Sequence, residues 1–365
     1  MIKYLGSKKR LVPVLGDLFQ KSGAETVLDL FTGTTRVAQE FKRRGGVVTA
    51  VDLSRYSKVF GDCWIATDSR SVEQQDLQNA VAYLNSLKGQ AGYFTETFCI
   101  KSRFFQPHNG ERVDVIRDAL ESEFKNSHLY PILLTSLILA ADRVDSTTGV
   151  QMAYVKKWAD RSFKQMELKI PELLSGGGTA IQGDAVALAP NLPPFDLAYL
   201  DPPYNQHRYF SNYHIWETLV AWDAPEHYGV ACKRIDNRDD STKSRFNERK
   251  NMPSAFKEVV KALKSQVMVL SYNNESWVTD EDLLEMCSSY ESVRLLAFDS
   301  KRYVGAQIGV FNPNGERVGE VSHLRNYEWI VIAGPNEVVQ RMISGYEIDE
   351  NGVVTRSAVE PARLF

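Results

Sequence analysis

The sequence has few cysteines, and their arrangement is not typical of a structural site. Only four occur in 365 residues, far apart and without a CxxC pair, so they indicate neither a zinc cluster nor a disulfide framework. The six histidines lack the spacing of metal ligands, and we expect no structural metal. Unpaired cysteines favour a reducing compartment, so we predict a cytoplasmic protein.

Long apolar runs are also missing. The longest, at 129–141, is interrupted by proline, threonine and serine and is shorter than the roughly 20 residues that span a bilayer. The N-terminus is basic, but Asp17 interrupts the apolar stretch that follows, and no small-residue cleavage site is present. We therefore expect neither a membrane segment nor a secretory signal.

An excess of positive charge is the third absence. The chain has 43 lysines and arginines against 46 aspartates and glutamates, a formal net charge of −3. Proteins that bind nucleic acid usually carry a basic face, so the whole-chain charge by itself disfavours DNA as a partner. The hydrophobic fraction of 43% and charged fraction of 24% indicate a folded chain, long enough for two domains or one large α/β domain with an insertion.

Residues 26–52 have the pattern of a βαβ unit. TVLDLF (26–31) is typical of a buried strand, 34–44 of an amphipathic helix, and VVTAVD (47–52) of a second strand. Because a strand, a glycine turn, a helix and a strand follow one another within about 30 residues, we expect the two strands to be parallel.

The rest of the chain divides by texture. Helical patterns dominate from about 57 to 178, whereas 205–255 is polar, aromatic and basic, and we expect long loops there. Strand patterns return after the glycines at 176–178. These features predict an α/β protein with a largely helical insertion, and the further strands are expected at 179–184, 195–201, 266–272, 292–298 and 327–333.

The first candidate site is DLFTGTTRVA (29–38). The glycine after a strand lets the backbone approach a ligand, and the N-terminus of the following helix offers unpaired N–H groups to a carboxylate or phosphate. Asp52 ends the next strand, where an acid can accept hydrogen bonds from ribose hydroxyls. The same pattern also occurs as a plain βα turn, and the absence of GxGxxG disfavours a dinucleotide.

The second candidate site is DPPY (201–204), at the end of the apolar strand FDLAYL. The Asp201 carboxylate and the Pro202 carbonyl can both accept hydrogen bonds from an exocyclic amino group, and consecutive prolines stiffen the backbone that carries them. Tyr204 offers a flat face on which a base can stack. This combination predicts a clamp for the amino group of a flipped-out base.

DLFTGTT and DPPY, in this order, resemble the S-adenosylmethionine-dependent N6-adenine DNA methyltransferases of the Dam-like D12 class. KYLGSK (3–8) resembles the family's N-terminal cofactor element. The resemblance spans 1–60 and 179–335 and implies a Rossmann-like mixed sheet flanked by helices. It also implies S-adenosyl-L-methionine as cofactor and S-adenosyl-L-homocysteine as product.

The resemblance implies roles for individual residues. Tyr4 and Lys8 would hold the methionine end of the cofactor. Asp184 would also belong to the cofactor site, but an acid at this position is equally typical of a turn after a strand. The family loop often reads FxGxG, and Thr35 replaces its second glycine. The implied cofactor residues are Tyr4, Lys8, Asp29, Phe31, Gly33, Asp52 and Asp184, and the implied catalytic residues are Asp201, Pro202, Pro203 and Tyr204.

Two basic clusters, 154–169 and 232–250, each have a local charge of +3 and include aromatic residues. Such clusters suit a DNA backbone, although either is also typical of a solvated loop. The candidate DNA contacts are Arg208, Lys233, Arg234, Arg245, Lys156 and Lys157. The expected organisation is a catalytic domain at 1–56 and 179–335, a DNA-contact and target-recognition insertion at 57–178, DNA-facing loops at 205–255 and a C-terminal extension at 336–365.

The resemblance predicts adenine-specific methylation of a particular double-stranded DNA sequence, by a solitary enzyme of bacterial or phage type or by the partner of a restriction endonuclease. Alternatives are an amino-methyltransferase of the same fold acting on cytosine N4, RNA adenine or a glutamine side chain, and a non-enzymatic DNA-binding protein. Asp201 favours adenine in DNA, because the other acceptors more often accompany SPPY or NPPY. A decayed site would have lost Gly33 and Asp52, which are present.

Overall fold

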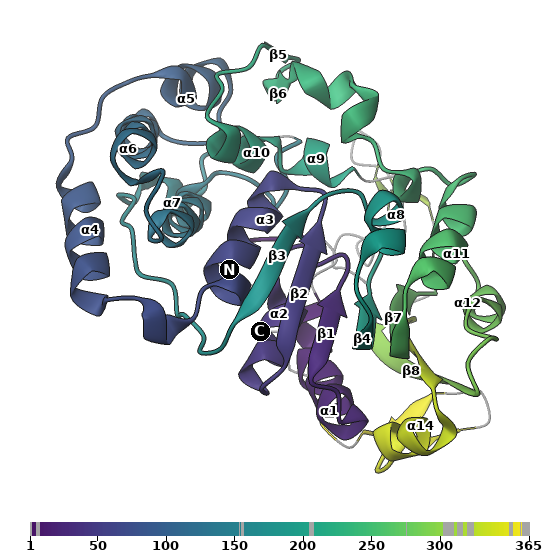
Figure 1. Ribbon diagram of the computed structural model, residues 1–365. Helices are drawn as coiled ribbons and strands as arrows, with labels where there is room; N and C mark the ends of the chain where they lie inside the picture. The colour runs from purple at the N-terminus through teal and green to yellow at the C-terminus, as the bar shows by residue number, and fades with distance from the viewer. Residues whose placement is uncertain are drawn as a thin grey trace.

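A seven-stranded mixed sheet forms the centre of the protein (Figure 1). The computed structural model describes residues 2–4, 8–152, 154, 157–203, 208–274, 276–301, 310–311, 317–319, 325–349, 353–357 and 359. The strand order is β3-β2-β1-β4-β7-β11-β8, and β11 runs antiparallel to both of its neighbours. The strands are β1 (Thr26–Asp29), β2 (Val47–Asp52), β3 (Gly178–Gln182), β4 (Phe195–Leu200), β7 (Ser265–Asn273), β8 (Ser292–Lys301) and β11 (Arg325–Gly334).

After β1 the chain forms β2 and β3 on one side of β1, and it then forms β4 on the other side of β1. Val27 of β1 pairs with Val48 of β2 and with Leu197 of β4, all in parallel register. In open α/β sheets the ligand crevice lies at the carboxyl ends of the strands where the order reverses, which here is between β1 and β4. The strands predicted from the sequence are confirmed, with ends that differ by at most three residues.

Helices cover both faces of the sheet, because successive side chains of each strand point to opposite sides. In β7, Val267 and Val269 belong to one apolar core, and Met268 and Leu270 belong to the other. The first face is covered by α1 (Val12–Ser22), α2 (Arg36–Arg43), α3 (Arg55–Gly61) and α14 (Asn336–Ile343), and the second by α8 (Ala185–Leu188), α11 (Met252–Ala262) and α12 (Asp280–Met286).

The segment between α3 and β3 is helical, as its sequence predicts, and lies beyond the β3 edge of the sheet (Figure 1). Its central helix, α7 (Tyr130–Val144), is buried over most of its length and packs against α3 and α6. The apolar residues of this segment form one continuous core with the first face of the sheet. The other helices are α4 (Gln74–Ser86), α5 (Tyr93–Thr95) and α6 (Pro107–Ala119).

The expectation of long loops at 205–255 is wrong for much of that segment. It contains α9 (Tyr209–Asn212), α10 (His214–Ala221), a hairpin of β5 (His227–Tyr228) and β6 (Lys233–Arg234), and the start of α11. The sequence pattern hides α10 because His214, Glu217 and Thr218 are buried together with its apolar residues. A helix buried on most sides shows little apolar periodicity.

Two small hairpins complete the described structure. They pair β9 (Val310–Phe311) with β10 (Arg317–Gly319) and β12 (Glu347–Ile348) with β13 (Val354–Arg356). Within the described residues, no helix is both long enough and apolar enough to cross a membrane.

Candidate active site

The carboxyl ends of β1, β2 and β4 bring Asp29, Asp52 and Asp201 to one open pocket. Parallel strands end at the same edge, so acids far apart in the sequence become neighbours there. Each predicted cofactor residue lines this pocket: Tyr4, Lys8, Asp29, Phe31, Gly33, Asp52 and Asp184. Asp201 and Pro203 line it as well, Pro202 is buried beside them, and Tyr204 lies outside the described residues.

A hydrogen bond joins the loop after β1 to the end of β2. The Gly33 N–H donates to Asp52 Oδ2 at 2.8 Å, and the Ser54 N–H donates to Asp52 Oδ1, also at 2.8 Å. Burial raises the pKa of Asp52, and these two hydrogen bonds oppose the rise. Gly33 has a φ of +51°, and a Cβ there would lie 3.0 Å from the Tyr4 hydroxyl. The glycine is therefore required by both the backbone conformation and the neighbouring ring.

Thr35, which replaces the family's second glycine, keeps a glycine-like backbone with a φ of +60°. This conformation costs a β-branched residue about 1–2 kcal/mol. The side chain is fully buried, and its Oγ1 accepts a hydrogen bond from Gln39 Nε2 at 2.8 Å. Thr35 therefore adopts a conformation typical of glycine, and the buried hydrogen bond offsets part of the strain.

Asp29 is buried with one unsatisfied oxygen. Its Oδ2 accepts a hydrogen bond from the Thr32 hydroxyl at 2.9 Å, whereas Oδ1 has no hydrogen-bond partner within the described part of the chain. Burial raises the pKa of Asp29 to about 7. A buried oxygen without a donor is costly in a folded protein, and a cationic or N–H-bearing ligand would satisfy it.

Asp184 and Phe31 both line the pocket. Asp184 Oδ1 accepts hydrogen bonds from the N–H groups of Val186 and Ala187, so this residue caps α8, as the turn-acid interpretation predicts. It also lines the pocket, so the two interpretations are compatible. Phe31 packs edge-on against Phe246, with ring centroids 4.9 Å apart.

Asp201 shares a cation with a second carboxylate. Lys8 Nζ lies 3.2 Å from Asp201 Oδ1 and 2.9 Å from Glu328 Oε2. Burial raises the pKa of Asp201 to about 6, with Lys8 opposing the rise and Glu328 adding to it. Sequence analysis missed Glu328. A lone acid inside the apolar strand YEWIVIA is the signal that could have identified it.

Comparison with known proteins shows to which family the chain belongs. The family model for D12 class N6 adenine-specific DNA methyltransferases matches residues 4–285. The chain belongs to this family.

Three of its relatives are named as methylases or methyltransferases. Modification methylase StsI of Streptococcus sanguinis is 30% identical over 79% of this chain. Type II methyltransferase M.NlaIII of Neisseria lactamica is 26% identical over 83%, and type II methyltransferase M.CviAII of Paramecium bursaria Chlorella virus 1 is 27% identical over 83%. The matched region spans 46% of the StsI methylase and 92% of each of the other two.

The candidate DNA contacts of this family member lie in different environments. Arg208 lines the pocket, and its Nη2 donates to the hydroxyl and carbonyl oxygens of Thr242. Lys157 is exposed and Lys233 is half-buried. Arg245 forms an ion pair with Glu258 on the surface. Lys156 lies outside the described residues.

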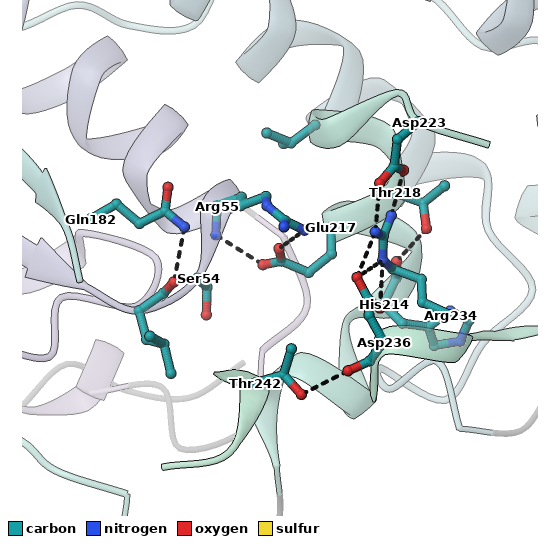
Figure 2. A network of polar contacts seen from close by, with 12 residues as sticks. Ser54, Arg55, Gln182, His214, Glu217, Thr218, Asp223, Arg234, Asp236 and Thr242 are labelled. Atoms are coloured by element: carbon teal, nitrogen blue, oxygen red, sulfur yellow. Dashed lines mark hydrogen bonds and ion pairs between the residues drawn. The ribbon is translucent and has the colours of Figure 1, made fainter. Parts of the chain in front are cut away.

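The expectation that Arg234 contacts DNA is corrected by its surroundings. The side chain is 2% exposed, and its guanidinium forms paired hydrogen bonds to Asp223 and to Asp236, which Figure 2 shows on either side of it. A guanidinium with its donors committed to two carboxylates has little left for phosphate. Arg234 instead holds the hairpin onto the end of α10.

A second polar contact in Figure 2 links α10 to the pocket. Glu217 Oε1 accepts a hydrogen bond from the Arg55 N–H at 2.9 Å, directly after the loop that Asp52 closes. Burial raises the pKa of Glu217 to about 7. Gln182 Nε2 donates to the Leu53 carbonyl from the other side. The loop after β2 is therefore held by side chains from two separate elements.

Replacing Gly33 by alanine tests whether the loop after β1 requires a glycine beside Tyr4. We expect Gly33→Ala to lower the free energy of unfolding by about 2–3 kcal/mol, because it adds left-handed strain and a contact with Tyr4. The matched control is Gly229→Ala, which has a φ of +69° and no heavy atom within 4 Å of its Cβ. Urea unfolding should show a smaller loss for the control, and equal losses would contradict the Tyr4 contact.

Removing Arg234 tests its structural role. Arg234→Ala leaves Asp223 and Asp236 without their cation, and we expect a loss of about 2–4 kcal/mol in the free energy of unfolding. Arg245→Ala breaks a pair that is largely exposed and should cost less than about 1 kcal/mol. Urea denaturation compares the two variants. A loss at Arg234 no larger than that at Arg245 would show that the buried pairs are not structural.

Proposed function

We propose that this chain transfers the methyl group of S-adenosylmethionine to the N6 amino group of an adenine in a specific double-stranded DNA sequence. The observation that carries the proposal is that Asp201 and Pro203, directly after β4, line the same pocket as the Gly33 loop. A base-binding clamp and a nucleoside-binding loop thus face one cavity. Adenine is the substrate named by the family model.

The residues of the pocket fit the proposed cofactor. The unsatisfied Asp29 Oδ1 would accept a hydrogen bond from the cofactor's ammonium group, and the Gly33 backbone leaves room for its close approach. Each Asp52 oxygen accepts one backbone hydrogen bond and has a further lone pair for a ribose hydroxyl. Phe31 and Asp184 would contact the cofactor's adenine, and Tyr4 would lie beside its methionine portion.

Asp201 is the residue that we assign to the transfer step. When bound, the cofactor supplies an electrophilic methyl group: the N6 lone pair forms the new C–N bond as the C–S bond breaks, and one amino proton leaves to solvent. The Asp201 carboxylate accepts a hydrogen bond from the amino group and orients its lone pair. The two prolines hold the carboxylate and the Pro202 carbonyl in one arrangement, so the rate arises from positioning and from oriented acceptors.

Asp201→Ala tests this role. We expect methyl transfer to fall at least about 100-fold, because the amino group loses its charged acceptor. Tritiated methyl incorporation into duplex DNA measures the rate, and sequencing that detects modified adenines reports base and site. Thermal unfolding and calorimetric binding of S-adenosylmethionine should remain near wild type. Incorporation at the wild-type rate would disprove the assignment.

We also propose where DNA binds. The hairpin of β5 and β6 and helices α9 and α10 lie beyond the carboxyl ends of the strands (Figure 1), and Tyr209 and Phe210 of α9 line the pocket. Lys233 on this hairpin, Arg208 at the pocket and Lys157 from the other basic cluster supply cations for phosphates. The helical segment 57–178 would contribute to recognition of the target sequence.

The setting of the reaction is part of the same proposal. The relatives named above are modification or type II methyltransferases, so we propose a cognate restriction endonuclease as the partner. The four cysteines are free and buried, which is consistent with a reducing cytoplasm.

Lys233→Ala tests the phosphate contacts. We expect DNA affinity to fall by a similar factor for different sequences, and the slope of log K against log salt to become shallower by about 0.9. Lys264→Ala is the matched control, because this exposed lysine directly precedes the amino end of β7, whereas the pocket lies at the carboxyl ends of the parallel strands. Fluorescence anisotropy at several salt concentrations measures both. An unchanged slope for Lys233→Ala would remove this residue from the interface.

A further inference from the structure

The Lys8 ammonium lies between two carboxylates. Its Nζ is 2.9 Å from Glu328 Oε2 and 3.2 Å from Asp201 Oδ1, and the Lys8 side chain is only 6% exposed. The nearer partner is thus Glu328, which has no role in the family resemblance, and the farther is the proposed catalytic acid. A buried ammonium with two anionic neighbours divides its attraction between them.

Glu328 is held in place by the sheet. It lies directly opposite Asn273 in the antiparallel register of β11 and β7, and Asn273 Nδ2 donates to its Oε1 at 3.0 Å. Its other oxygen accepts the hydrogen bond of Lys8. Both oxygens therefore have donors, and the carboxylate has a defined orientation on a central strand. Groups fixed by regular strands position a reactive side chain better than groups on loops.

Among the residues that the structure describes, four ionisable groups face Asp201 from the elements around it. They are Lys8 from the turn before α1, Glu328 from β11, Asp29 from β1 and Tyr199 from β4. Lys8 lowers the pKa of Asp201, whereas Glu328 raises it. The charges of Lys8 and Glu328 therefore act on the pKa of Asp201 in opposite directions.

We propose that Glu328 is a positioning residue for methyl transfer, which keeps the Lys8 ammonium shared so that it orients Asp201 without occupying it. The inference rests on the proposed function. A lysine paired with Asp201 alone would compete with the incoming amino group for the carboxylate oxygens. A lysine hydrogen-bonded to Glu328 attracts Asp201 through the ion pair at Oδ1, and Oδ2 is the acceptor that we assign to the amino group.

The test is the pH profile of Glu328→Gln, which removes one charge and keeps an oxygen that can accept from Asn273. We expect kcat for DNA methylation near neutral pH to fall about tenfold, because the ammonium moves fully onto Asp201. The acid limb of the kcat profile should move to lower pH by about 0.5–1 unit, because a neighbouring negative charge is lost. Lys8→Met should move the same limb to higher pH.

Controls separate this role from simple structural support. Glu337→Gln removes the same charge from the exposed start of α14, after the far end of β11, and should match wild type. Glu328→Asp keeps the charge, and its acid limb should stay near that of wild type. Calorimetric affinity for S-adenosylmethionine should change less than about threefold in Glu328→Gln.

Each outcome of the pH profiles either supports or overturns the proposed role of Glu328. A downward shift of the acid limb in Glu328→Gln, opposite to that of Lys8→Met, supports the proposal, and an unchanged or upward limb overturns it. A wild-type protein that methylates no DNA would refute the proposed function instead. In that case, or if a variant is inactive, ¹³C NMR titration of the Asp201 carboxyl gives the same comparison without activity, with Asp201→Asn identifying its signal.

Discussion

The position of β1 between β2 and β4 is the constraint on which the site depends. Parallel pairing on both sides places the ends of these three strands at one edge of the sheet. Asp29, Asp52 and Asp201 come from different parts of the sequence, yet they line one pocket because of that pairing. The hydrogen bond from Gly33 to Asp52 then closes the loop across the strand ends. No local feature of any single segment produces this arrangement.

The site contains buried carboxylates whose ionisation destabilises the folded state, which a purely apolar core would avoid. Burial raises the pKa of Asp29, Asp201 and Glu217, so keeping these carboxyls ionised in the folded state opposes stability. Lys8 and Arg55 compensate part of this cost at Asp201 and Glu217. Buried acids with shifted pKa values and a shared pocket are typical of functional sites, and the unsatisfied oxygen of Asp29 fits a ligand that completes the arrangement.

The charge of the protein has meaning only by location. A net charge of −3 disfavours DNA when it is treated as a single number, but the sum says nothing about which cations are free to bind phosphate. Arg234 belongs to a basic cluster in the sequence, yet two aspartates surround it in the fold. Arg245 is partly committed to Glu258, whereas Lys157 is exposed. A local count of charges therefore overestimates the basic surface, because it cannot show ion pairs.

The sequence by itself determined the βαβ start, the strands of the main sheet and the helical insertion, because these depend on local periodicity and glycine positions. The pocket residues were predicted from the resemblance of short motifs to a known family. The sequence did not identify α10, since a helix buried on most sides has no polar face to mark it. Only the tertiary structure decided the partners of Arg234 and the sharing of Lys8 between Asp201 and Glu328. The Lys8–Glu328 contact joins residues 320 positions apart, and strand pairing and burial, not local pattern, bring them together.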